Sequence, residues 1–411
     1  RRVGKTVMIH HAIKNLIEDG ITPTSICYVS LDHPLYNGLR LEEILNHFAE
    51  IQRLNIRKRP AFIIFDEIQY LRNWENELKR LVDDYPRLKC IASGSAAAAL
   101  RLKSNESGAG RFTEFLLPPL TFHEYLLLLN KMELIKERPA LDEGDRVLLT
   151  APNIEALNDS FVHYLNYGGY PEVIFSQEIQ QNPQRFVKSD IIDKVLLRDL
   201  PSLYGIDDVN ELNYLFTTLA LNTSGEISIE ELSKNSGVAK NTIKRYITYL
   251  EAAFLIKIVH RVDHTAKRFK RANFFKVYLT NPSIHSALFS PEESGDSLGR
   301  LAETAVYSQW FHSTSTLNYA RWKDGEIDIV QMGRQKPRWV VEVKWSDRIV
   351  NHLEELDSLV KFCKHHALES ARVTTKTIQA ETQVDGVRIR FVPTALYCYR
   401  VGKNLIDWKQ S

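Results

Sequence analysis

A glycine, a lysine and a hydroxyl side chain stand together near the start of this chain, in the run Gly4-Lys5-Thr6. They are the end of the phosphate-binding pattern G-x-x-x-x-G-K-[ST], in which backbone N–H groups and a helix N-terminus hold phosphates. In that pattern the lysine reaches the β- and γ-phosphates and the hydroxyl ligates Mg²⁺. We therefore predict a nucleotide site at Arg2, Gly4, Lys5 and Thr6. The first glycine of the pattern would precede Arg1, so we expect a fragment that lacks the first strand.

Two carboxylates farther along supply a second part of such a site. Asp66 and Glu67 follow the apolar run 61–65, which has the length and composition of a buried parallel strand. In P-loop enzymes the carboxylate at this strand end holds the Mg²⁺ shell, and a following glutamate polarises the attacking water. The run 88–92 ends at Ser93-Gly94-Ser95, where Ser95 is expected to sense the γ-phosphate. Thr6 and Asp66 are thus the predicted metal ligands, and Glu67 and Ser95 the predicted catalytic residues.

Three carboxylates and a lysine in the last third form a separate constellation. Asp328 lies in the apolar run 325–330, and Glu342 and Lys344 lie in the run 339–344, where strand alternation puts both on one face. Asp328 and Glu342 would share a divalent ion, Glu303 would complete its shell, and Lys344 would stabilise an attacking hydroxide or the phosphate. An alternative is a salt-bridge cluster without an ion, in which Lys344 pairs with a carboxylate.

Positive charge is concentrated between these two constellations. Residues 228–276 hold eleven Lys and Arg against four Asp and Glu, a net +7 in a chain of net +2. A short helix from 229, a glycine-containing turn at 235–238, a second helix over 240–253 and two strands predict a winged helix-turn-helix. Such a fold suits duplex DNA or a docked protein. The expected DNA contacts are Lys240, Lys244, Arg245, Lys267, Arg268, Lys270 and Arg271.

The elements that must position the first site alternate along the chain. Predicted strands over 26–31, 61–65 and 88–92 follow or precede predicted helices over 7–18, 41–54 and 75–84. This alternation predicts an α/β fold with a doubly wound parallel sheet, whose carboxyl strand ends carry the ligand. Residues 126–205 read as largely helical, and we expect them to form a lid on the nucleotide domain.

The composition of the chain excludes several classes of protein. With 411 residues, 44% hydrophobic and 25% charged, the chain is neither collagen-like, disordered nor a disulfide scaffold. No apolar run reaches the length of a membrane span and no signal peptide is evident, so a cytoplasmic protein without a membrane partner is expected. The four cysteines lack metal or disulfide spacing and are expected to be reduced.

Taken together, the motifs resemble the AAA-type ATPase domain of a broad bacterial and archaeal family of ATP-binding proteins. The resemblance rests on R-R-V-G-K-T, D-E-I-Q, S-G-S, and G-R-F followed by P-P-L-T-F-H-E-Y, and on Gly168-Gly169-Tyr170-Pro171-Glu172. It extends from Arg1 to about Asp347. Members end in a winged helix and a restriction-endonuclease-like, PD-(D/E)xK domain, which the E…D…E-x-K residues also resemble. The resemblance implies binding of ATP with Mg²⁺ and its hydrolysis. It makes Arg111 a candidate arginine finger or sensor, in cis or in trans, or a surface arginine.

These inferences predict four domains and one principal function. The expected domains are a P-loop core over 1–125, a helical lid over 126–205, a winged helix over 206–285 and a restriction-endonuclease-like domain over 286–411. The expected protein is an ATPase whose nucleotide state controls a DNA-binding and DNA-cleaving tail. The alternatives are a nucleotide-sensing switch with an inactive nuclease-like domain and a scaffold that clamps another protein. Assembly into a homo-oligomer, the DNA site and the biological pathway stay open.

Overall fold

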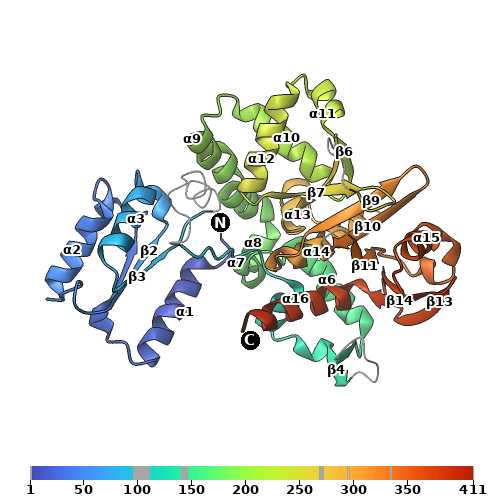
Figure 1. The fold of residues 1–411 in the computed structure, drawn as a ribbon, viewed down its shortest axis with the longest axis horizontal. Coiled ribbons are helices and arrows are strands. Elements are labelled where there is room, and N and C mark those ends of the chain that lie inside the picture. Colours follow the sequence, from blue (N-terminus) through green and yellow to red (C-terminus); the bar gives the residue numbers. More distant parts are fainter. Residues whose placement is uncertain are drawn as a thin grey trace. The chain divides into compact units, whose positions relative to one another are not determined.

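The computed structural model describes residues 2–95, 112–139, 147–267, 273–293, 295, 297–333 and 336–410. The chain forms two compact units, Arg1–Leu117 and Pro118–Ser411, and Figure 1 follows the chain through them by colour. Within the described ranges, no helix is both long enough and apolar enough to cross a membrane.

The first unit holds a parallel sheet of three strands in the order β1-β2-β3. The predicted alternation of strands and helices is present, with ends that differ by a few residues from those expected. The elements are α1 (Lys5–Glu18), β1 (Ile26–Ser30), α2 (Leu41–Ile51), β2 (Ala61–Asp66), α3 (Trp74–Asp84) and β3 (Leu88–Ala92), with 3-10 turns at Pro23–Ser25, Pro34–Tyr36 and Ile68–Tyr70.

The central strand β2 separates two environments in this unit. Ile63 and Phe65 point into a hydrophobic core shared with α2 and α3. Asp66 belongs to the opposite face, where Thr6 of α1 reaches its carboxylate. Because side chains alternate along a strand, the buried core on one face and the polar group on the other follow from the same run of residues.

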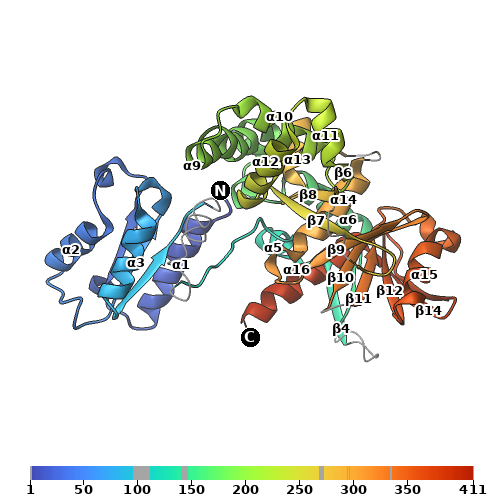
Figure 2. The same ribbon diagram turned by 45° about the horizontal axis from the view of Figure 1, so that its top comes forward.

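The second unit is built on one sheet of nine strands in the order β13-β14-β12-β11-β10-β9-β7-β8-β6. Figure 2 shows this sheet running from β7 through β9, β10 and β11 to β12. Its strands are β6 (Glu226–Ser228), β7 (Ile256–Val262), β8 (Phe274–Leu279), β9 (Leu317–Trp322), β10 (Gly325–Met332), β11 (Pro337–Glu342), β12 (Ser370–Thr375), β13 (Ala380–Val384) and β14 (Val387–Pro393). A separate hairpin joins β4 (Lys136–Pro139) to β5 (Val147–Thr150).

Helices cover both faces of the nine-stranded sheet. One core gathers side chains of α5, α6, α14 and α16, and a second core is formed on the other face with α15. The helices are α5 (Phe122–Leu128), α6 (Ile154–Tyr167), α7 (Pro171–Phe175), α8 (Gln177–Gln181), α9 (Leu200–Tyr204), α10 (Val209–Leu221), α11 (Ile229–Ser236), α12 (Lys240–Ala252), α13 (Ser283–Phe289), α14 (Ser297–Gln309), α15 (Asp357–His365) and α16 (Thr394–Gln410). Gln184–Asp193 and Val195–Asp199 are π-helical, and 3-10 turns lie at Met132–Leu134, Trp310–His312, Arg348–Val350 and Leu353–Leu356.

The ranges expected to be separate domains share cores within this second unit. Arg261 and Val262 of β7 pair with Tyr319 and Ala320 of β9, so the sheet crosses the expected boundary at 285/286. Phe161 of α6 packs on Trp345, with ring centroids 5.4 Å apart, which brings the expected lid range 126–205 into the same core. The sheet therefore contains residues from two of the expected ranges, and one core contains residues from these two and from the lid range.

The Gly168-Gly169 pair has a packing role here. The Gly169 carbonyl accepts a hydrogen bond from the Leu120 N–H at 3.0 Å. A Cβ added at Gly169 would collide with Asn281 and with the Ser283 hydroxyl. The glycine thus allows the chain after α6 to lie directly against the segment that precedes α13.

Candidate functional site

The Gly4-Lys5-Thr6 run opens α1 in the geometry that a phosphate loop needs. Gly4 has φ 92°, in the left-handed region that favours glycine, and α1 begins at Lys5 without a side-chain N-cap. The first intrahelical bond runs from the Met8 N–H to the Gly4 carbonyl at 2.9 Å. The N–H groups of the first turn have no partner within a helix, so this helix start is suited to bind an anion.

The loop and the strand end meet at Asp66. The Thr6 hydroxyl donates to Asp66 Oδ2 at 2.7 Å, and Asp66 is 1% exposed. Tyr28 donates to the same oxygen at 3.1 Å, while the Ser93 hydroxyl and the Glu67 N–H donate to Oδ1. Burial by itself raises the pKa of Asp66, but the hydrogen bonds from Ser93, Thr6 and Tyr28 outweigh it and hold this pKa below its usual value.

Thr6 and Asp66 fit a Mg²⁺ ion that accompanies a nucleotide. Such ions take one or two protein oxygen ligands, with phosphates and water completing the octahedron. A buried, ionised carboxylate beside a hydroxyl on the first turn of a phosphate-type helix supplies that set. The two residues expected to hold the metal thus contact each other in the structure.

Glu67 is held next to Asp66 by a second chain of contacts. Its backbone is left-handed, with φ 54°, and its N–H also lies 3.2 Å from the Ser93 hydroxyl. Its carboxylate accepts from Gln69 Nε2, and Gln69 Oε1 in turn accepts from the Ser95 N–H at 3.2 Å. The D-E-I-Q and S-G-S motifs are thus one connected structure.

The hydroxyl nearest the metal position differs from the one expected. Ser95 is the expected sensor, but its N–H donates to Gln69, and the hydroxyl that donates to Asp66 belongs to Ser93. Ser93 is tied to the end of β2, because its N–H donates to the Phe65 carbonyl at 2.8 Å and its carbonyl accepts from the Ile68 N–H at 2.9 Å, which places its hydroxyl beside Asp66. Tyr28 and Gln69 were also missed. Tyr28 could have been found from the parallel register, because it pairs with Ile64 and shares a face with Asp66.

For Lys5 and Arg2, the other predicted residues of the phosphate loop, the structure gives the exposure and the backbone conformation. Lys5 is half-buried at the start of α1, and Arg2 is exposed with φ 58°. Arg111 lies outside the described residues.

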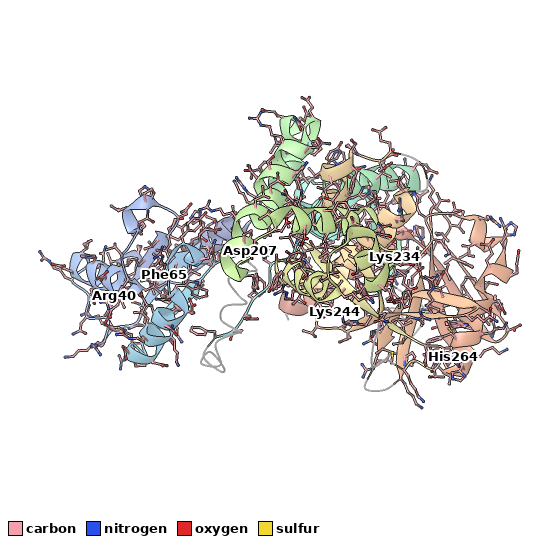
Figure 3. The ribbon with its side chains drawn as sticks, turned by 90° about the horizontal axis from the view of Figure 1, so that it is seen from above. Arg40, Phe65, Asp207, Lys234, Lys244 and His264 are labelled. Atoms are coloured by element: carbon pink, nitrogen blue, oxygen red, sulfur yellow. The ribbon has the colours of Figure 1, made fainter. Side chains whose placement is uncertain are left out.

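The predicted helix-turn-helix is present in the second unit. Gly237, with φ 73°, ends α11, and α12 begins at Lys240. Lys244 and Arg245 are exposed on α12, and Figure 3 labels Lys244 there and Lys234 on α11. Lys240 pairs with Glu230 at 2.9 Å, and Lys267 is exposed after β7. Arg268, Lys270 and Arg271 lie outside the described residues.

Much of the basic charge counted in this range is compensated locally. Lys257 pairs with Glu251 at 2.7 Å, and Arg261 lies 3.6 Å from Glu226. Lys276, on β8, is buried among carboxylates. In the described part of this segment, the net charge of +7 therefore overstates the positive charge at the surface. Lys244 and Arg245 are exposed cations of α12.

The acidic residues of the last third surround Lys276. Its Nζ lies 3.0 Å from Glu303 Oε1, 2.9 Å from Glu326 Oε1 and 3.1 Å from Asp328 Oδ1, and its side chain is 4% exposed. Tyr278 donates to Glu303 Oε1 at 2.6 Å. Burial lowers the pKa of Lys276, but the surrounding anionic groups outweigh it and raise this pKa well above its usual value.

A β-bulge sets the direction of Asp328. The β10–β9 register shifts between Ile327 and Val330, and Ile327 and Ile329 consequently enter cores on opposite faces of the sheet. Asp328 Oδ2 accepts the Val343 N–H at 2.9 Å, just beyond the end of β11. Lys276 and Lys344 lower the pKa of Asp328 against the effect of burial.

Glu342 and Lys344 form a pair at the edge of this cluster. Lys344 Nζ lies 2.8 Å from Glu342 Oε1, while Glu342 Oε2 is buried without a hydrogen-bond partner. Burial and the nearby Asp328 raise the pKa of Glu342 to about 8 and that of Glu303 to about 7. The two residues of E-x-K thus share a face, as the alternation predicts.

The arrangement of Glu303, Asp328 and Glu342 differs from the shared metal site that the sequence predicts. Among the residues that the structure describes, no three His, Cys, Asp or Glu side chains are arranged to hold a metal ion. Glu303 and Asp328 converge on the Lys276 ammonium instead, a contact that could not be read from the E…D…E-x-K spacing because Lys276 comes from a strand outside that motif.

Comparisons with known proteins match two separate ranges of the chain. Residues 1–126 match a family described as an AAA domain, and residues 158–294 match a domain of unknown function (DUF8612). An uncharacterized protein of Methanocaldococcus jannaschii, MJ1544, is 23% identical over 386 residues, covering 93% of this chain and 81% of the relative. An uncharacterized protein of Haemophilus influenzae is 21% identical over 397 residues, covering 95% and 91%. A second M. jannaschii protein, MJ1637, is 26% identical over 287 residues, covering 67% and 58%.

The match at the N-terminus supports an AAA-type P-loop domain and therefore nucleotide binding. The parallel sheet of the first unit is compatible with that assignment.

Proposed function

We propose that the first unit binds ATP with Mg²⁺ and hydrolyses it, and that the second unit contacts duplex DNA through α12. The observation that carries the first half is the hydrogen bond between Thr6 of the phosphate-type loop and the buried Asp66 carboxylate. It joins the two residues that P-loop enzymes use to hold the metal, and the match to an AAA domain supports it.

Each residue of this site has a role that its position supports. The first-turn N–H groups of α1 and the Lys5 ammonium bind phosphate oxygens, and Thr6 and Asp66 would hold Mg²⁺, which when bound neutralises phosphate charge. Glu67, whose carboxylate is oriented by Gln69, accepts a hydrogen bond from the attacking water. The lowered pKa of Asp66 keeps its carboxylate charged at neutral pH.

A matched pair of lysine substitutions on α1 tests nucleotide binding. Lys5→Ala removes the cation nearest the predicted phosphates, so Mg-ATP affinity should fall at least tenfold. Lys14→Ala removes an exposed lysine that pairs with Glu18 at 3.6 Å, and affinity should not change. Titration calorimetry with Mg-ATP measures both, and equal affinities in the two variants would reject the phosphate role of Lys5.

The second half of the proposal rests on the exposed cations of α12. A helix that follows a helix-turn pattern can enter a major groove, and each phosphate contact gives a slope of log affinity against log salt near −0.9. The double change of Lys244 and Arg245 to Ala should weaken duplex binding and flatten the slope by about 1.8. Lys257→Ala on β7 is the control and should leave the slope unchanged. A slope near zero for the unsubstituted protein would favour protein docking instead.

Control of the second unit by nucleotide is tested by turnover. If the two sites are coupled, each ligand alters the other's binding, so duplex DNA should change the occupancy of the ATP site and with it the steady-state rate of hydrolysis at subsaturating ATP. Hydrolysis that is slow and the same with and without DNA would favour a binding switch.

A further inference from the structure

We propose that the Lys276 ammonium is a built-in cation of the second unit and occupies the position where a divalent ion would bridge Glu303 and Asp328. While Lys276 is present, this acidic cluster binds no divalent metal. The inference goes beyond ATP and DNA binding and does not depend on either. It concerns the cluster of Lys276, Glu303, Glu326 and Asp328.

Three carboxylates surround the Lys276 ammonium. An ammonium group has three N–H donors and no acceptor. Lys276 donates hydrogen bonds to Glu303 and Asp328, and Glu326 lies 2.9 Å from Nζ as a third ion-pair partner. Carboxylate partners of this kind are what allows a lysine to be buried with its charge.

Asp328 and Glu303 make further hydrogen bonds. Asp328 uses Oδ1 for Lys276 and Oδ2 for the Val343 N–H, and the bulge in β10 fixes its direction. Glu303 Oε1 accepts from both Lys276 and Tyr278. An ion that bridged Glu303 Oε1 and Asp328 Oδ1 would have to replace the ammonium that already joins them.

Both cations cannot occupy the cluster together. At 4% exposure the Lys276 side chain has little water to screen it, so a second positive ion bound to the same oxygens would be repelled strongly. The observation that favours an ion is the buried, unpartnered Glu342 Oε2. That side chain is already paired with Lys344, which lies 2.8 Å from the other oxygen of the same carboxyl group.

The origin of each group shows what the ammonium does. Lys276 lies on β8, whereas Glu303 lies on α14 and Glu326 and Asp328 lie on β10. Lys276 therefore ties the strands that follow the helix-turn-helix to the later half of the sheet. The neighbouring Glu226 repeats this bridge, since β6 carries it and Arg321 of β9 lies 3.2 Å away.

Manganese binding separates the two readings of the cluster. All proteins carry Asp66→Asn, so that the nucleotide site lacks its carboxylate ligand, and no nucleotide is added. Lys276→Met keeps the length of the side chain and removes its charge, leaving carboxylates that a divalent ion can bridge. Titration with Mn²⁺, followed by the paramagnetic resonance of the free ion, should show one ion per chain bound at least tenfold more tightly than to the protein that retains Lys276.

Two further proteins define the outcome. Adding Asp328→Asn to Lys276→Met should remove the gained ion, and Lys257→Met, which takes a lysine from a surface pair, should gain none. Two results would overturn the proposal. One is that the protein that retains Lys276 binds one Mn²⁺ ion and loses it on Asp328→Asn. The other is that folded Lys276→Met binds no more Mn²⁺ than the protein that retains Lys276. If Lys276→Met does not fold, the comparison of the protein with and without Asp328→Asn decides alone, and absence of an Asp328-dependent ion supports the built-in cation.

Discussion

At the scale of single residues, the contacts of Asp66 distinguish two nearby serines. Ser93 donates to Asp66, whereas the Ser95 N–H donates to Gln69. Removing a hydrogen bond to a charged group costs about 1.5–3 kcal/mol. Ser93→Ala should therefore weaken Mg-ATP binding about tenfold or more, and Ser95→Ala should weaken it less because its backbone contact remains. Calorimetric titration of both variants checks this, and a larger loss in Ser95→Ala would restore the originally predicted role of that serine.

The two adjacent carboxylates should separate binding from turnover. Glu67→Gln keeps the shape of the side chain and removes its charge, so nucleotide should still bind while turnover falls about 100-fold or more, as for loss of a general base. Asp66→Ala removes the metal-holding carboxylate and should lose both. Steady-state phosphate release and nucleotide affinity are measured together. Unchanged turnover in Glu67→Gln would show that this glutamate does not act on water.

At the scale of elements, one aspartate holds the turn after β12. Asp347 Oδ1 accepts the N–H groups of Lys376, Thr377 and Ile378 at 2.8–3.2 Å, and Oδ2 accepts the Thr377 hydroxyl at 2.7 Å. Burial raises the pKa of Asp347, but the hydrogen bonds from Thr377 and its neighbours outweigh it and hold the pKa below the usual value. The carboxylate therefore stabilises the folded turn in its ionised form.

Asp347→Ala should lower the free energy of unfolding by about 1 kcal/mol or more at pH 7. Because the folded pKa is depressed, this contribution is complete above the unfolded pKa of about 3.9 and is lost as pH falls through the folded pKa. The difference between the two proteins should shrink accordingly in urea titrations below about pH 4. Asp357→Ala, which removes an exposed partner of Lys361, is the control and should cost about 0.5 kcal/mol or less at either pH.

At the scale of the whole molecule, the sheet of the second unit runs through all nine strands, so we expect this unit to unfold cooperatively. Strands β8 and β10 lie on either side of the expected boundary at 285/286, yet β7 and β9 join them and Lys276 binds Asp328 across them. We expect their amides to share one opening free energy in native-state hydrogen exchange. Exchange of β8 at a clearly lower free energy than β10 would instead indicate two domains that unfold separately.

The first unit was largely predictable from the sequence because its information is local. Apolar runs such as 61–65, helix periodicity and the glycine before Lys5 specify strands, a helix and a loop by rules that involve only nearby residues. Strand polarity places Asp66 at the carboxyl edge of the sheet, and in the structure the Thr6 hydroxyl donates to its carboxylate. The helix-turn between α11 and α12 was predictable for the same reason, since Gly237 marks its end.

The second unit depends on contacts that no local pattern contains. Lys276 lies in the run F-F-K-V-Y-L, where its charge reads as part of a basic surface, and only pairing among β7, β8, β9 and β10 buries it among carboxylates. The bulge that turns Asp328 likewise arises from the fit between two strands. Local periodicity determined which elements form. Register and burial, which follow from residues distant in the chain, determined that an ammonium stands among the acidic residues expected to hold a metal.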